Sequence, residues 1–164
     1  MRQFEIVQKI FALGATYQVF PPRMGGTLKT VKGKVFTFLP RLNMVDGDEG
    51  THAGSLTGNF FKTDFRIMGA SGMEVARMKF PLFSFKARFT LTTGGRSYTA
   101  AAGFTGLNFT VNDERGELAF SVDKKLFAVK DKFSLFIADD FDMDIAVLAT
   151  VAVDQKYFQQ ENTG

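Results

Sequence analysis

The sequence contains no cysteine, no tryptophan and only one histidine in 164 residues. The absence of cysteine excludes disulfide bonds, thiolate nucleophiles, cysteine-ligated zinc and iron–sulfur clusters. Because His52 is the single histidine, a histidine-rich metal site is excluded as well. The sequence therefore predicts no metal site and no cofactor.

A strong excess of charge of one sign is also missing. Twenty Lys and Arg residues stand against seventeen Asp and Glu residues, which leaves a net charge of +3. Proteins dedicated to nucleic-acid binding usually carry a larger and more clustered excess of positive charge. The chain has twenty Phe but only three Tyr, so we expect a phenylalanine-packed core and no aromatic platform for stacking bases. Nucleic acid is therefore not an expected partner.

Long hydrophobic runs are absent. The most apolar stretch, Ile145–Val153, has nine residues, which span ~13 Å as a helix against ~30 Å of membrane hydrocarbon. We therefore expect no transmembrane segment. The amino-terminal residues Met1–Glu5 lack the apolar core of a signal peptide, so a cytoplasmic location is expected. No linker or low-complexity stretch divides the chain, which predicts a single domain over residues 1–164.

Alternation of apolar and polar residues is the dominant pattern. It is clearest over Val75–Phe80 and Phe83–Leu91, with Pro81-Leu82 between them as a turn. Further strand-like runs are Val35–Leu39, Phe65–Met68, Tyr98–Ala101, Leu107–Val111, Leu118–Val122 and Phe133–Ala138, with weaker ones near residues 4–7, 17–20, 28–31 and 52–57. About twelve short strands separated by turn signals predict a mainly β fold, either an antiparallel barrel or a sandwich.

The segment Ile145–Val153 breaks this alternation, because it is nearly continuous apolar sequence. Asp139, Asp140, Asp142 and Asp144 lie at its start, where a helix favours negative charge and an Asp cap. A helix formed by these nine residues has apolar side chains facing every direction and must be buried on all sides. The pattern predicts a helix enclosed by sheet, with a buried β-strand as the alternative because the segment contains three valines.

Several segments taken together resemble the LURP-one-related family. They are Val31–Phe36, Met44–Gly50, Leu118–Phe127 with Asp131–Phe133, and Val147–Gln155, whose ending looks like the family's closing helix and its Asp-Gln exit. The resemblance covers residues 4–155 in the family's order. It implies the tubby C-terminal-like fold, a closed antiparallel barrel of twelve strands around one central hydrophobic helix. The implied relatives are the tubby-like proteins, which bind phosphoinositides, and the phospholipid scramblases.

The hairpin over Val75–Leu91 carries the most suggestive group of charges. If Pro81-Leu82 is a two-residue turn, Arg77 opposes Lys86, and four cations share the outer face of the hairpin. These candidate residues for an anionic ligand are Arg77, Lys79, Lys86 and Arg88. The alternative is an ordinary solvated surface on which Asp and Glu of neighbouring strands lie between the cations.

Other polar groups favour structural roles. The acidic run Asp139–Asp144 could bind calcium as in scramblases, but it lacks the spacing of an EF-hand and is explained by helix capping. Asp46–Gly50 is typical of a hairpin turn. His52 and Ser55 have no nucleophile elbow or carboxylate partner, so no catalytic residue is assigned.

These observations predict a protein that is not an enzyme. The expected function is a binding module for anionic phospholipid or phosphoinositide headgroups or a membrane surface, with basic side chains on a rigid barrel capturing the ligand. The alternative is a regulatory or structural module that binds a protein partner, for which the conspicuous surface would be apolar.

Overall fold

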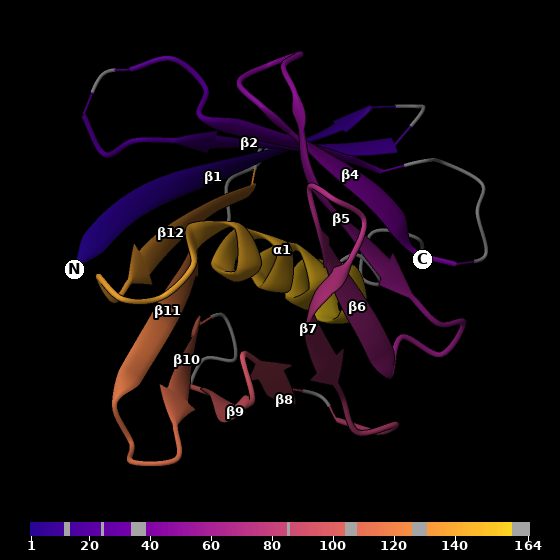
Figure 1. The fold of residues 1–164 in the computed structure, drawn as a ribbon, viewed down its shortest axis with the longest axis vertical. Coiled ribbons are helices and arrows are strands. Elements are labelled where there is room, and N and C mark those ends of the chain that lie inside the picture. Colours follow the sequence, from indigo (N-terminus) through magenta and orange to yellow (C-terminus); the bar gives the residue numbers. More distant parts are fainter. Residues whose placement is uncertain are drawn as a thin grey trace.

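The computed structural model describes residues 1–11, 14–23, 25–33, 39–84, 86–103, 108–125 and 131–158. Each strand pairs antiparallel with its neighbours in sequence, and the first strand pairs with the last, so that the sheet closes into a barrel (Figure 1). The strands are β1 (Arg2–Phe11), β2 (Gly14–Phe20), β3 (Lys29–Gly33), β4 (Arg41–Asp46), β5 (His52–Gly58), β6 (Asp64–Gly69), β7 (Glu74–Lys79), β8 (Arg88–Thr93), β9 (Arg96–Ala102), β10 (Asn108–Asp113), β11 (Leu118–Lys125) and β12 (Asp131–Ile137). The mainly β barrel of twelve strands is confirmed.

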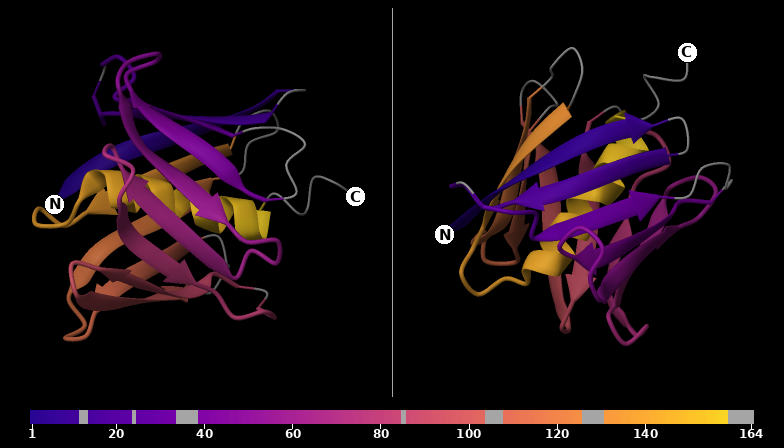
Figure 2. Two further views of the ribbon diagram at one scale, coloured as in Figure 1. Left: turned by 45° about the vertical axis from the view of Figure 1, so that its right-hand side comes forward. Right: turned by 90° about the horizontal axis from the view of Figure 1, so that it is seen from above.

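The helix α1 (Met143–Val153) runs through the barrel, and a π-helical turn, η1 (Asp154–Phe158), continues it (Figure 2). Every residue of Ile145–Val153 is buried. The predicted central helix is therefore confirmed, and the strand alternative is wrong. The helix begins two residues before the predicted start, because the Asp142 side chain accepts a hydrogen bond of 3.0 Å from the Ile145 N–H.

Phenylalanine side chains pack between the sheet and α1, as the composition predicts. Their rings contact one another edge-on or tilted, with centroids 5.1–6.4 Å apart, in a row that passes from strand to strand. The row consists of Phe65, Phe80, Phe89, Phe109, Phe120 and Phe141. The inward positions of the strands thus surround the helix with aromatic surface.

The strict up-and-down order of the strands gives the barrel two distinct ends. Asp144, in the first turn of α1, lies at the end that holds Lys29 at the start of β3, 3.2 Å away. At the other end, the Lys62 side chain from the β5–β6 loop donates to the Gln155 carbonyl just after α1. We call this second end, where α1 finishes and where the β5–β6 and β7–β8 loops lie, the helix-exit end.

The predicted hairpin over Val75–Leu91 is wrong in its register. Arg77 opposes Thr92 and Lys79 opposes Thr90, so the described residues between β7 and β8, 80–84 with 86 and 87, belong to a loop in place of the two-residue turn. Pro81 has no N–H to give to a ladder. The Phe80 N–H donates to the Thr63 carbonyl and so extends the pairing of β7 with β6, whereas the pairing of β7 with β8 ends at Lys79 and Thr90.

Three of the expected strands fall partly outside the described residues, one of them being Phe83–Leu91, of which residue 85 is outside. Residues 35–38 of the run Val35–Leu39 are outside them, and so is Leu107, directly before β10. The remaining expected strands coincide with observed ones to within a few residues.

Candidate functional site

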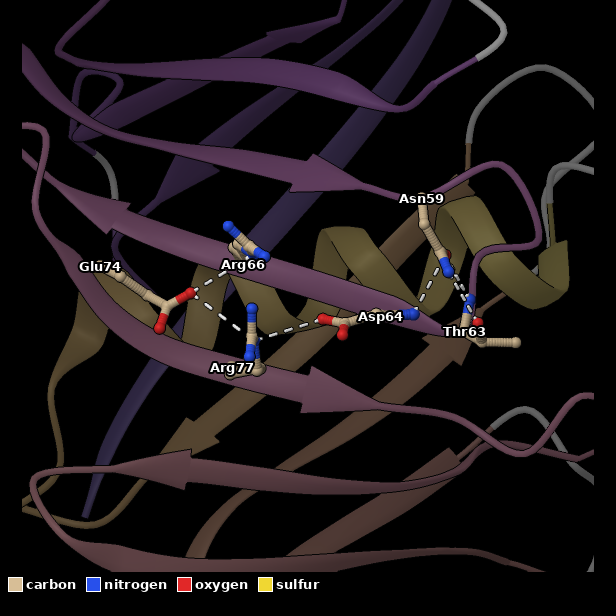
Figure 3. A network of polar contacts seen from close by, with 6 residues as sticks. All are labelled: Asn59, Thr63, Asp64, Arg66, Glu74 and Arg77. Carbon is tan, nitrogen blue, oxygen red and sulfur yellow. Dashed lines mark hydrogen bonds and ion pairs between the residues drawn. The ribbon is translucent and has the colours of Figure 1, made fainter.

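The β5–β6 loop is a tight turn organised by the side chain of Asn59. The Asn59 Oδ1 accepts hydrogen bonds from the backbone N–H groups of Thr63 and Asp64, at 2.8 and 3.1 Å, and its Nδ2 donates to the Thr63 hydroxyl at 2.8 Å (Figure 3). An Asn side chain that replaces backbone partners in this way fixes a turn without a sheet ladder. The residues between Asn59 and Thr63 are therefore presented in a defined conformation.

Four large apolar side chains project from the helix-exit end. Phe60 and Phe61 are 60% and 65% exposed, and their rings meet edge-on at 5.2 Å. On the β7–β8 loop, Leu82 is 54% and Phe83 is 89% exposed. The hydrogen bond from the Phe80 N–H to the Thr63 carbonyl, 2.8 Å long, joins the two loops. We call these four side chains the apolar tip; large apolar groups gathered in solvent mark an interaction surface.

Two lysines lie at the base of the apolar tip. Each donates a hydrogen bond to the backbone carbonyl of the residue that precedes the other lysine. The Lys62 ammonium donates to the Gln155 carbonyl at 2.9 Å, and the Lys156 ammonium donates to the Phe61 carbonyl at 3.2 Å. Burial lowers the pKa of both lysines, and the neighbouring charge of Lys156 lowers the pKa of Lys62 further. Sequence patterns gave no sign of this lysine pair, because its members are 94 positions apart along the chain.

Arg77, one of the four predicted anion-binding cations, lies on the middle of the outer face and is neutralised there. Its Nε lies 3.4 Å from Asp64 and 3.6 Å from Glu74, which in turn lies 3.6 Å from Arg66 (Figure 3). Two arginines and two carboxylates alternate across β6 and β7, so this part of the barrel is a balanced solvated surface.

The other three predicted cations come together at the helix-exit end. Lys79 is the last residue of β7 and Arg88 the first of β8, and both are exposed on the outer face. Lys86 is exposed on the loop between them, the same loop that carries Leu82 and Phe83 of the apolar tip. The structure thus places Lys79, Lys86 and Arg88 next to apolar groups and leaves Arg77 apart.

The acidic residues before α1 have structural partners. Asp139 forms an ion pair of 2.9 Å with the amino terminus, Asp142 caps the helix, and Asp144 pairs with Lys29. Within the described ranges, no group of three or more His, Cys, Asp or Glu side chains could hold a metal ion. His52 is exposed at the start of β5.

A buried polar cluster closes the helix-exit end from inside. The Tyr17 hydroxyl donates to the Asp154 carboxylate at 2.5 Å and accepts a hydrogen bond of 3.0 Å from the Gln155 side chain. The Lys124 ammonium lies 3.5 Å from Asp154 and 3.1 Å from Asp131. Lys124 follows Phe120 and Val122 at the inward positions of β11, so strict alternation could have revealed it as a buried charge.

Comparisons with known proteins agree with this architecture. A family model described as LURP-one-related matches residues 2–154, as the sequence segments predict. The chain is also similar to the X-ray structure of a protein from Arabidopsis thaliana, with 15% identity, 93% of this chain and 88% of that chain covered, and a TM-score of 0.62. No curated protein sequence matches the chain. Among the described residues, no helix combines the length and apolar character needed to cross a bilayer.

Proposed function

Because the chain belongs to the LURP-one-related family, we propose that it is a binding module without catalytic activity whose target is a membrane surface rich in anionic phospholipid. The family and the barrel fold support a binding module. The observation that carries the membrane target is the apolar tip with Lys79, Lys86 and Arg88 beside it at the helix-exit end. Apolar side chains beside cations match the boundary between acyl chains and anionic headgroups.

The expected affinity is modest. Each cation near an anionic surface contributes ~1 kcal/mol, and full burial of one Phe or Leu side chain adds about 1.5–3 kcal/mol. Three cations with partial insertion of the apolar tip therefore supply roughly 5–8 kcal/mol, which corresponds to dissociation constants between millimolar and micromolar. Binding should weaken as salt screens the cations and should persist in part through the apolar contacts.

We propose that the protein is not a catalyst because its most concentrated polar groups lie where a substrate cannot reach them. The most concentrated set, around Tyr17 and Asp154, is fully buried and engaged in mutual hydrogen bonds. A substrate has no access to these groups, since catalytic side chains need to lie within hydrogen-bond reach of the reacting atoms.

Co-sedimentation with liposomes tests the proposal. The wild-type protein should bind vesicles of phosphatidylcholine with phosphatidylserine at low salt and should ignore pure phosphatidylcholine. Replacing both Phe60 and Phe83 by Ser should remove most of this binding. Met73→Ser is the matched control, because Met73 is 70% exposed on the β6–β7 turn at the opposite end of the barrel.

A wild-type protein that ignores anionic vesicles even at low salt overturns the membrane proposal. The apolar tip would then favour the second candidate function, a module that binds a protein partner, because exposed aromatic side chains are also the anchors of protein interfaces. Loss of binding in Met73→Ser as well as in the Phe60/Phe83 variant would likewise contradict a site at the helix-exit end.

A further inference from the structure

The lysine pair, Lys62 and Lys156, has more hydrogen-bond donors than the structure uses. Each ammonium carries three N–H donors, and each gives one to a backbone carbonyl, those of Gln155 and Phe61 respectively. Neither lysine has an ion pair with a carboxylate in the part of the chain that the structure describes. The two neighbouring ammonium groups therefore have N–H donors to spare, and no carboxylate among the described residues forms an ion pair with either of them.

The backbone at Lys62 adds to the cost of this arrangement. Lys62 has φ = 53°, the only positive φ of a residue other than glycine among the described residues. The left-handed conformation is unfavourable for a lysine, whereas Gly or Asn adopts it readily. A strained, partly desolvated lysine held against a second lysine is the kind of feature that marks a binding site.

Asp154 does not supply the missing anion. Its charge raises the pKa of Lys62, but burial and the charge of Lys156 lower that pKa by more. Its carboxylate is already occupied by the Tyr17 hydroxyl and by Lys124. The two ammonium groups consequently lack a carboxylate of their own among the described residues. Lys156 is buried and Lys62 is half-buried, so an anion from outside approaches from the side of Lys62.

We propose that Lys62 and Lys156 form a site for a phosphomonoester dianion, carried by a lipid headgroup at the membrane surface. The inference rests on the membrane-binding function proposed above and names the headgroup class. The charge of −2 on a phosphomonoester balances two ammonium groups, and its three terminal oxygens match the donors that remain. A phosphodiester has one charge and two free oxygens, so it satisfies the pair less well.

The surroundings fit a headgroup. Phe60 and Phe61 directly precede Lys62, and both are exposed beside it. When these rings enter the interfacial region of a bilayer, the lysine pair lies at the level of the headgroups. The aromatic side chains thus determine how deeply the protein inserts into the bilayer, and the lysine pair selects the lipid headgroup.

The test compares two vesicles of equal surface charge, one of phosphatidylcholine with phosphatidic acid and the other of phosphatidylcholine with phosphatidylserine. Inorganic phosphate is the soluble probe, followed by the shift in melting temperature. The variant is Lys62→Asn, which removes the charge and suits the left-handed backbone. Lys156→Gln is a second variant, and Arg115→Gln, on the β10–β11 turn at the opposite end, is the control for loss of one positive charge.

The wild-type protein should bind phosphatidic acid vesicles about tenfold more tightly than phosphatidylserine vesicles, and Lys62→Asn should remove this preference while Arg115→Gln keeps it. Equal binding of both vesicles by the wild type overturns the site and leaves the membrane function standing. A wild type that binds no vesicle but gains thermal stability from phosphate, with the gain lost in Lys62→Asn, supports a site for a soluble phosphomonoester and overturns the membrane function. If the wild type responds to neither probe, both proposals fail.

Discussion

The hydroxyl of Tyr17 donates a hydrogen bond of 2.5 Å to the carboxylate of Asp154, 137 positions later in the chain. Asp154 follows the last residue of α1, where the negative end of the helix dipole disfavours a carboxylate. Tyr17 and Lys124 offset this cost inside the barrel, and their contacts hold the end of the helix against β2 and β11. The backbone of Gln155 and Lys156, which supplies one member of the lysine pair and the carbonyl that Lys62 contacts, starts from this fixed point.

Removing the hydroxyl should therefore weaken the fold. Tyr17→Phe keeps the ring but removes the shortest hydrogen bond to the Asp154 carboxylate, and a hydrogen bond to a charged group contributes about 1.5–3 kcal/mol. We expect a decrease of that size in the free energy of unfolding, measured by urea denaturation at an unchanged m-value. Tyr157→Phe is the control, since the Tyr157 hydroxyl donates a long, exposed hydrogen bond of 3.4 Å to the Arg88 carbonyl and has no buried carboxylate to satisfy. A loss below about 0.5 kcal/mol in Tyr17→Phe would contradict a stabilising role.

The same residue predicts a loss of stability in alkali. Burial, followed by the charge of Asp154, raises the pKa of Tyr17 well above its usual value of 10.0. Above pH 10 the unfolded chain releases the phenol proton while the folded protein retains it, so the unfolded state gains and stability falls as the pH rises. The difference in unfolding free energy between the wild type and Tyr17→Phe should shrink above pH 10 and stay constant between pH 7 and pH 9. A constant difference through pH 11 would contradict the raised pKa.

The sequence predicts the parts of the fold that depend on local pattern. Period-two alternation locates most of the strands, and the nearly continuous apolar run Ile145–Val153 has no polar face, so a buried element is predictable there, with the acidic residues before it favouring a helix. The cluster around Tyr17 and Asp154 is not, because no local pattern shows which inward polar side chains will meet across the barrel.

The candidate site shows the same limit. Alternation continues through Phe83, yet Phe83 belongs to a loop, because the pairing of β7 with β8 ends at Lys79 and Thr90. The neutralisation of Arg77 depends on Asp64 of another strand. Both facts depend on the register of strand pairing. Period-two alternation does not determine the register, because a shift by two residues leaves the same side chains on the same face of the sheet.

A charge placed on the helix should prevent folding. Leu148 is fully buried at the centre of α1, and Leu148→Asp would strand a carboxylate in an apolar interior at a cost of several kcal/mol. Circular dichroism should show no cooperative melting transition. Val75→Asp is the control, since Val75 is exposed on the outer face of β7 and the same new charge should be tolerated there. A folded Leu148→Asp variant would contradict the enclosed helix.

Calcium should leave the melting temperature unchanged. Asp142 is engaged as the helix cap and Asp144 is paired with Lys29, so neither is arranged as a metal ligand. A ligand at one hundred times its dissociation constant adds ~2.7 kcal/mol, which a melting experiment detects. Replacement of Asp142 by Ala should instead cost about 1 kcal/mol through loss of the cap, with or without calcium. A rise in melting temperature with calcium that disappears in the Asp142→Asn/Asp144→Asn double variant would show a metal site.

The predicted basic residues should separate into two classes when tested with anionic vesicles. Arg77 is neutralised by Asp64 and Glu74, whereas Lys79 and Arg88 lie at the strand ends that border the apolar tip. Arg77→Gln should lower the free energy of unfolding by less than about 1 kcal/mol and leave vesicle binding unchanged.

Lys79→Gln and Arg88→Gln should each weaken vesicle binding about fivefold, the loss of ~1 kcal/mol per cation, without lowering the melting temperature. Because all three changes remove one positive charge, they differ in position alone. Equal losses of binding in the three variants would mean that overall charge drives attachment, and a selective loss in Arg77→Gln would move the site from the helix-exit end to the outer face of β7.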